Sequence, residues 1–191
     1  MTTQSALRLL PALLSLLVAA CSATEERPPS KEAPPPTMDT APAAPQTVEW
    51  KVTYTGVGPI RVGMTVAQAR EALNGALVIK DSSTSCYYAR LGKGPEDVSL
   101  MITNGQIARV DIIGDSITTE AGARVGDTED RIKTLYAGRV EVQPHKYTNG
   151  HYLVVKPDAG ESRLIFETDG SKVTLYRAGK LPEVEWVEGC Y

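Results

Sequence analysis

Few side chains in this 191-residue chain have the spacing that catalysis requires. His145 and His151 are the only histidines, and they lie in or beside a polar loop over residues 144–150. A metal site needs further ligands at a suitable spacing, and the sequence offers none. It contains no nucleophile elbow, metalloprotease helix motif or phosphate-binding loop, and the acidic tail at 183–188 implies no cleft. We therefore predict that this protein is not an enzyme, with no catalytic, cofactor-binding or metal-ligating residues.

Cys21 is the cysteine whose neighbours indicate a covalent modification. Arg8 is followed by an apolar run over residues 9–18 and by two alanines directly before the cysteine. Such a pattern is typical of a secretory signal peptide, and the run falls short of the ~20 apolar residues that a membrane span needs. The small residues and cysteine resemble the lipobox of bacterial lipoproteins, which implies that residues 1–20 are removed and Cys21 carries lipid. An ordinary signal peptide or a membrane helix is the alternative.

Residues 21–46 are predicted to be a lipidated cysteine followed by an extended linker. This stretch contains seven prolines, no aromatic residue and no hydrophobic periodicity. A segment of this composition cannot bury enough apolar surface to offset its ordering entropy, and the prolines exclude a helix. In enterobacterial sorting, Asp after the lipidated cysteine retains a lipoprotein at the inner membrane. By analogy, Ser22 predicts an outer-membrane lipoprotein that faces the periplasm.

The charge balance excludes two classes of partner. The chain has 23 acidic and 20 basic residues, so it is weakly acidic and lacks the basic patch typical of nucleic-acid binding. It also lacks a polybasic segment for anionic lipids. Attachment to a membrane must therefore come from the lipid on Cys21.

Cys86 and Cys190 remain as an even pair in a chain predicted to be exported. Oxidising compartments favour disulfides between such pairs. We predict a Cys86–Cys190 bridge, and two buried free thiols are the alternative.

Residues 47–191 are predicted to form one folded domain. Thr65, with Gln68 three residues later, predicts a capped helix start, and a second helix is expected from Thr128. Asn104-Gly105 and Asp169-Gly170 predict two-residue hairpin turns with positive φ at both central residues. Apolar alternation predicts strands at about 48–54, 77–80, 86–91, 98–103, 108–112, 139–142, 152–156, 163–168 and 173–177.

Two landmarks recur at nearly one offset. Arg-Val-Gly at 61–63 returns 63 residues later at 124–126, and the Asn-Gly turn at 104–105 is followed 65 residues later by the Asp-Gly turn. We interpret this as a duplication, with repeats of about 47–113 and 114–191, each a helix followed by a short antiparallel sheet. Segregated helices and strands indicate the α+β class. Two generic helix starts and two generic hairpins are the alternative.

The turn and cap motifs also resemble known families. The helix entries Gly63-Met64-Thr65 and Gly126-Asp127-Thr128 resemble the repeat of the β-lactamase inhibitor protein and that of small outer-membrane lipoproteins of the SmpA/OmlA type. Asn-Gly-Gln-Ile-Ala-Arg-Val-Asp-Ile at 104–112 is similar to an RpoE-regulated enterobacterial lipoprotein family of unknown function. These resemblances span most of residues 50–178 and imply a fold. The residues used for inhibition have no match here, so no residue role is carried over.

We therefore predict a lipid-anchored periplasmic module that binds a protein, in envelope assembly or as an inhibitor. Its contact surface would be the sheet face that the helices leave free. A domain that binds peptidoglycan or another carbohydrate is the alternative, which an aromatic-lined groove would favour, whereas a broad apolar patch would favour a protein. The candidate contact residues, on the free face and in the 144–150 loop, are Arg109, Asp111, Arg163, Glu167, His145 and Tyr147.

Overall fold

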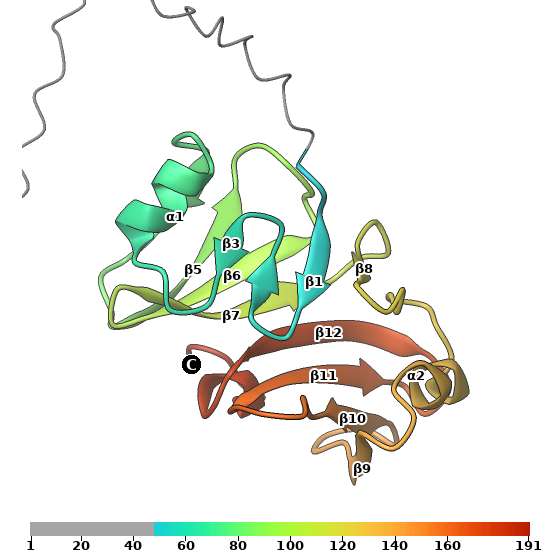
Figure 1. Cartoon of the computed structure of the whole chain (residues 1–191). Helices are drawn as coiled ribbons and strands as arrows, with labels where there is room; N and C mark the ends of the chain where they lie inside the picture. The colour runs from blue at the N-terminus through green and yellow to red at the C-terminus, as the bar shows by residue number, and fades with distance from the viewer. Residues whose placement is uncertain (1–47) are drawn as a thin grey trace, which may run out of the picture. The chain divides into compact units, whose positions relative to one another are not determined.

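An eight-stranded antiparallel sheet dominates the part of the chain that the computed structural model describes, residues 48–191. The predicted signal peptide at 1–20 and the linker at 21–46, including Cys21, lie outside these residues. The strand order is β4-β5-β6-β7-β12-β11-β10-β9, and most of these strands are labelled in Figure 1. In chain order the strands are β4 (Leu77–Ile79), β5 (Cys86–Leu91), β6 (Val98–Thr103), β7 (Gln106–Ile112), β9 (Val140–Pro144), β10 (His151–Val155), β11 (Ser162–Thr168) and β12 (Val173–Lys180).

A smaller sheet and short helices accompany the large sheet. The smaller sheet has the order β3-β2-β1-β8, in which β1 and β8 are parallel and the other pairs are antiparallel. Within residues 48–191 no helix is both long and apolar enough to cross a membrane. These elements are β1 (Lys51–Thr53), β2 (Gly56–Val57), β3 (Ile60–Arg61), β8 (Thr118–Thr119), α1 (Val66–Ala72), α2 (Glu129–Leu135) and the 3-10 helix η1 (Glu183–Glu185).

Both α-helices begin at the predicted threonine caps. The backbone N–H of Gln68 donates to Thr65 Oγ1 at 3.2 Å, and the N–H of Thr65 donates to Gln68 Oε1 at 2.8 Å. This reciprocal pair is the capping box that the sequence predicts. At α2, the N–H of Arg131 donates to Thr128 Oγ1 at 3.2 Å. The helix starts are therefore confirmed.

The predicted α+β class, with tandem helix-plus-sheet repeats, is wrong. The described chain is mostly β, because each α-helix has only seven residues, or about two turns. Residues Asn74 and Gly75, with φ of 51° and 84°, end α1 at once. The strands of the two halves also do not form separate sheets. Strand β7 pairs with β12, so four strands from each half join in one continuous sheet.

One face of the large sheet is apolar and largely covered. Helices α1 and α2 and the smaller sheet pack on it and form the main core. At its centre the Phe166 ring lies 5.2 Å from that of Tyr176 and 5.8 Å from that of Tyr136, centroid to centroid. The Tyr176 hydroxyl donates to the carbonyl of Ile117 at 3.1 Å, so this buried polar group is satisfied.

The two predicted hairpin turns differ. Thr103 pairs with Gln106, and the two residues between them, Asn104 and Gly105, have φ of 51° and 76°, which confirms the first turn. In the second hairpin Thr168 pairs with Val173, so residues 169–172 form a four-residue loop. The Asp169 carboxylate accepts from the N–H groups of residues 171 and 172 at 2.8 Å each. This side-chain turn replaces the predicted two-residue geometry, and only Gly170 has positive φ there.

Candidate binding face

The second face of the large sheet is covered in part by the end of the chain. We call residues 181–191 the C-terminal strap. It follows β12 directly, and Figure 1 shows it turning back beside β11 and β12 near the C-terminus. Val184 of the strap is fully buried in a small apolar cluster with Tyr152, Val154 and Ile165. The residues on either side of Ile165 point into the main core, so the strap lies on the face opposite the helices.

Arg109 holds the strap through its backbone. Its guanidinium donates to the carbonyls of Glu183 at 3.0 Å and Trp186 at 2.7 Å. It also donates to the Tyr88 hydroxyl at 2.9 Å and forms an ion pair with Asp111 at 3.0 Å. Each guanidinium nitrogen of this buried cation therefore has a partner, as a buried charge requires. Burial raises the pKa of Asp111, although Arg109 opposes that shift.

Arg177 repeats this arrangement on β12. Its Nε donates to the carbonyl of Val184 at 2.6 Å, and its Nη1 pairs with the Glu167 carboxylate. Glu167 also lies 3.5 Å from His145 Nε2, and the His145 ring stacks on Tyr152 with centroids 4.5 Å apart. Two buried arginines thus bind three carbonyl groups of the strap, those of residues 183, 184 and 186, which fixes its position on the sheet.

A disulfide joins the strap to β5. Cys86 and Cys190 are bonded, with their Cα atoms 5.3 Å apart and 104 residues between them in sequence. The predicted bridge is therefore confirmed. It ties the last residues of the chain to a strand of the first half, next to the Arg109 contacts.

Two hollows meet at this disulfide. One has a volume of about 420 Å³ and lies between β4, β5 and Tyr191. The other, of about 400 Å³, runs along the strap, and both are lined by Cys86 and Tyr191. We call the two together the disulfide groove. Its lining residues include Val78, Lys80, Tyr88, Arg90, Trp186 and Tyr191.

The groove combines aromatic and cationic side chains. Tyr191 is fully exposed, while Trp186 and Val78 are 38% and 47% exposed. Lys80 and Arg90 add positive charge beside the tyrosines. Aromatic surface with cations at its border is the composition of protein-binding hot spots, and exposed aromatic rings also suit sugars.

The predicted contact residues are only partly accessible. Arg109 and Asp111 were expected on a free face, but they are 4% and 8% exposed because the strap covers them. That expectation is wrong. Glu167 is half-buried in its pairs with Arg177 and His145.

The remaining predicted contacts lie apart from the groove. Arg163 is half-buried and donates to the carbonyls of Ser162 and Gly160. Tyr147 is 59% exposed, and its backbone N–H donates to His145 Nδ1 at 3.1 Å. Neither Arg163 nor Tyr147 lines either hollow of the disulfide groove.

The sequence contained a signal for the groove, although neither Tyr88 nor Tyr191 is among the predicted contact residues. Tyr88 follows Cys86 by two residues, and Tyr191 follows Cys190 directly. Residues two apart in a strand share a face, so the predicted disulfide already places Tyr88 and Tyr191 on one side of the sheet. Trp186 had no such signal, because its place depends on the buried Arg109.

A separate polar cluster ties α2 to the sheet. The Glu129 carboxylate accepts from Thr168 Oγ1 at 2.6 Å and from His151 Nδ1 at 2.8 Å. Burial raises the pKa of Glu129, but these hydrogen bonds outweigh it and lower the pKa overall. No hydroxyl or thiol of residues 48–191 bonds to His151 Nε2, so the pair lacks a nucleophile. In the same part of the chain no three metal-ligating side chains gather.

Comparisons with known proteins leave the family open. No protein-family model matches the chain, and no curated protein matches it. The crystal structure of the uncharacterized protein yfeY from Escherichia coli has a TM-score of 0.45 and 15% sequence identity to this chain. The match covers 68% of this chain and 99% of that chain. The resemblances drawn from sequence motifs stay predictions.

Proposed function

We propose that this protein is a lipid-anchored, non-enzymatic module of the outer membrane that faces the periplasm and binds an envelope protein. The disulfide groove is the proposed contact surface. The observation that carries this proposal is the meeting of Tyr88, Trp186 and Tyr191 with Arg90 around the Cys86–Cys190 bridge. Trp, Tyr and Arg dominate binding energy at protein interfaces.

The strap makes this surface ready for binding. Arg109 and the disulfide hold residues 183–190 in one position. A rigid surface loses little conformational entropy when a partner binds. The two adjoining hollows, of about 420 and 400 Å³, form an extended site suited to a polypeptide segment.

Carbohydrate is the second candidate ligand. The aromatic rings in the groove favour it, because sugars stack on exposed aromatic faces. Val78 and the adjoining apolar part of the strap favour protein, since the buried core of a protein–protein interface is more apolar than the rest of the surface. Binding of a partner protein therefore remains the leading proposal.

The anchoring proposal rests on Cys21 and its neighbours in sequence. Growth with a fatty-acid analogue should label the wild-type protein, whereas Cys21→Ser should give an unlabelled precursor or a soluble protein. Fractionation of the envelope should place the labelled protein in the outer membrane. Equal labelling of wild type and Cys21→Ser would contradict lipidation at this residue.

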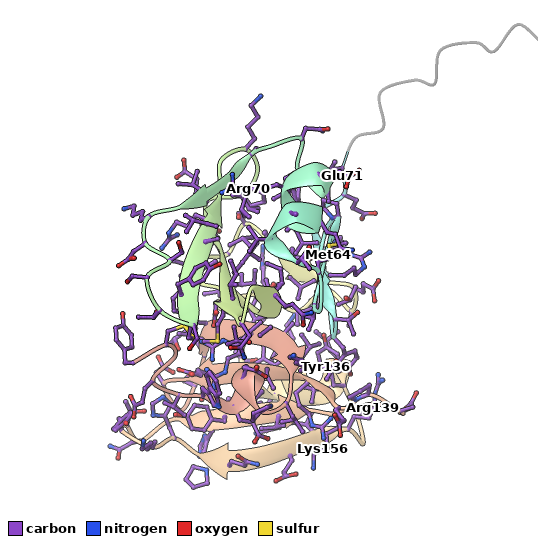
Figure 2. The ribbon with its side chains drawn as sticks, turned by 90° about the vertical axis from the view of Figure 1, so that its left-hand side faces the viewer. Met64, Arg70, Glu71, Tyr136, Arg139 and Lys156 are labelled. Atoms are coloured by element: carbon purple, nitrogen blue, oxygen red, sulfur yellow. A yellow bond between two sulfur atoms is a disulfide. The ribbon has the colours of Figure 1, made fainter. Side chains whose placement is uncertain are left out.

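Site-directed photo-crosslinking in intact cells tests the binding surface. A photoreactive residue replaces Trp186 in one variant and Glu71 in a control. Glu71 is exposed on α1, the helix that covers the other face, as Figure 2 shows. We expect a discrete protein adduct from position 186 and none from position 71. A glycan adduct at 186 would favour the carbohydrate candidate, and equal adducts at both positions would refute the groove as the contact surface.

A further inference from the structure

A small pocket lies between the two sheets, away from the disulfide groove. It has a volume of about 180 Å³. Its walls come from β1 and the residue after it, from the segment after β8, and from the end of α2 and β11. We call it the inter-sheet pocket, and the lining residues that matter here are Tyr54, Glu120, Tyr136, Arg139 and Leu164.

Tyr54 carries an unused hydroxyl at this pocket. Its oxygen is buried and has no hydrogen-bond partner within residues 48–191. The neighbouring Tyr136 hydroxyl is different, because it donates to Thr119 Oγ1 at 2.7 Å. A buried polar group without a partner is costly to the fold, so the Tyr54 hydroxyl is suited to a ligand that supplies an acceptor.

Two exposed residues of opposite charge, Arg139 and Glu120, also line the pocket, and Glu120 lines a neighbouring hollow together with Lys51 and Arg61. The side chains of Arg139 and Glu120 form no ion pair or side-chain hydrogen bond with the described part of the chain. The Arg139 guanidinium lies 6.0 Å from the Tyr136 ring centre, and Figure 2 shows the two residues on the same side of the molecule. Burial raises the pKa of Tyr54, the charge of Arg139 lowers it and that of Asp158 raises it.

These features define the chemistry of the occupant. A guanidinium and a hydroxyl donor together bind a carboxylate, whereas Glu120 repels an anion and attracts an ammonium group. An occupant with a single charge would pair with either Arg139 or Glu120 and leave the other side chain without a partner. At ~30 Å³ for each water, the pocket has room for about six water-sized groups, which is the number of non-hydrogen atoms in alanine.

We propose that the inter-sheet pocket binds a small zwitterion of the α-amino acid class. Arg139 and the Tyr54 hydroxyl hold its carboxylate, Glu120 holds its ammonium group, and Leu164 contacts its aliphatic carbon. This site is independent of the disulfide groove, so either can fail without the other.

Saturation-transfer NMR on the full lipidated chain in detergent tests the proposal. The probes are L-alanine, propionate, which lacks the ammonium group, and ethylamine, which lacks the carboxylate. We expect saturable binding of L-alanine, with at least tenfold weaker binding of each single-charge probe. No saturable alanine binding would overturn the proposal, and so would propionate binding as tightly as alanine.

Variants separate a binding role from a structural one. Tyr54→Phe and Arg139→Gln should each weaken alanine binding about tenfold or more, the usual effect of losing a hydrogen bond to a charged group. Tyr54→Phe should not lower the melting temperature, because its hydroxyl has no partner in the protein. Arg163→Gln is the control and should bind alanine as the parent does. Unchanged affinity in Tyr54→Phe would overturn the assignment of that residue.

Discussion

The two faces of the large sheet are covered in different ways. On one face, α1, α2 and the smaller sheet bury an apolar core around Phe166 and Tyr176. On the other face a strap of eleven residues is held by Arg109, Arg177 and a disulfide, with only a small apolar cluster beneath it. Apolar burial is non-directional, whereas hydrogen bonds from a guanidinium require each acceptor in place. The first face therefore gives bulk stability, and the second gives the strap one defined position.

The buried charges under the strap differ from the apolar core in what they contribute to the protein. A buried ion pair adds little net stability compared with apolar residues of the same volume, but removing one partner is strongly destabilising. The charges under the strap are thus best understood as positioning groups for the disulfide groove.

The largest effect is expected for Arg109→Ala. This change leaves Asp111 buried without its cation and leaves two strap carbonyls without a donor. Removing one partner of a buried pair costs about 3–5 kcal/mol. Chemical denaturation should show this loss in the free energy of unfolding.

Arg163→Ala is the matched control on β11, because sequence alone placed Arg163 and Arg109 on the same face. Its side chain bonds only to nearby carbonyls, and its loss should cost less than about 0.5 kcal/mol. Equal losses for both arginines would contradict the difference in burial.

The next largest effect is expected from opening the disulfide. The double variant Cys86→Ser/Cys190→Ser should lose about 2–4 kcal/mol, because the bridge closes a long loop in the unfolded chain. Hydrogen exchange should then increase in the strap while the amides of β11 and β12 stay protected. Equal increases in hydrogen exchange in the strap and in β11 and β12 would mean that the strap does not open independently of the sheet.

A smaller effect on the free energy of unfolding is expected at high pH, where tyrosines on the two faces lose their protons. Burial raises the pKa of Tyr136 from 10.0 to about 12, with a partly opposing contribution from its bond to Thr119. The folded state then holds the phenolic proton more tightly than the unfolded chain does. This contribution to stability is present below pH ~10 and is lost as the pH rises toward 12.

Tyrosine-to-phenylalanine variants measure this effect. Tyr136→Phe should reduce the decline in unfolding free energy between pH 10 and 12 relative to wild type. Tyr88 lies under the strap, where burial and Asp111 raise its pKa but Arg109 lowers it. Tyr88→Phe should therefore change the decline less. If Tyr88→Phe changed the decline more than Tyr136→Phe does, the proposed order of the two tyrosine contributions would be contradicted.

Local features of the fold were predictable from sequence. Strands β5 and β6 have the predicted bounds, the threonine caps at 65 and 128 are present, and the turn at 104–105 has the expected geometry. Each of these depends on neighbouring residues, such as the reach of a threonine hydroxyl to an N–H three residues later. The Cys86–Cys190 bridge was also predictable, because export leaves an even pair.

Long-range features were not predictable in the same way. Pairing of β7 with β12 joins residues 109–112 to 176–179 and has no local signature, so the single sheet was missed. Burial of Arg109 was missed because charge alternation normally marks a solvent face, and only the strap changes that. The disulfide groove depends on both features, and the sequence therefore showed its tyrosines but not its shape.

The most direct test of the binding face uses two valines with equal exposure. Val78 on β4 and Val142 on β9 are each 47% exposed and lie in the two edge strands of the large sheet. Val78 lines the disulfide groove, and Val142 does not. Asp at either position should change the free energy of unfolding by no more than about 0.5 kcal/mol. In quantitative capture of the crosslinked partner from the envelope, Val78→Asp should retain much less partner than wild type and Val142→Asp should retain as much. Equal capture by both variants would contradict the disulfide groove as the binding surface.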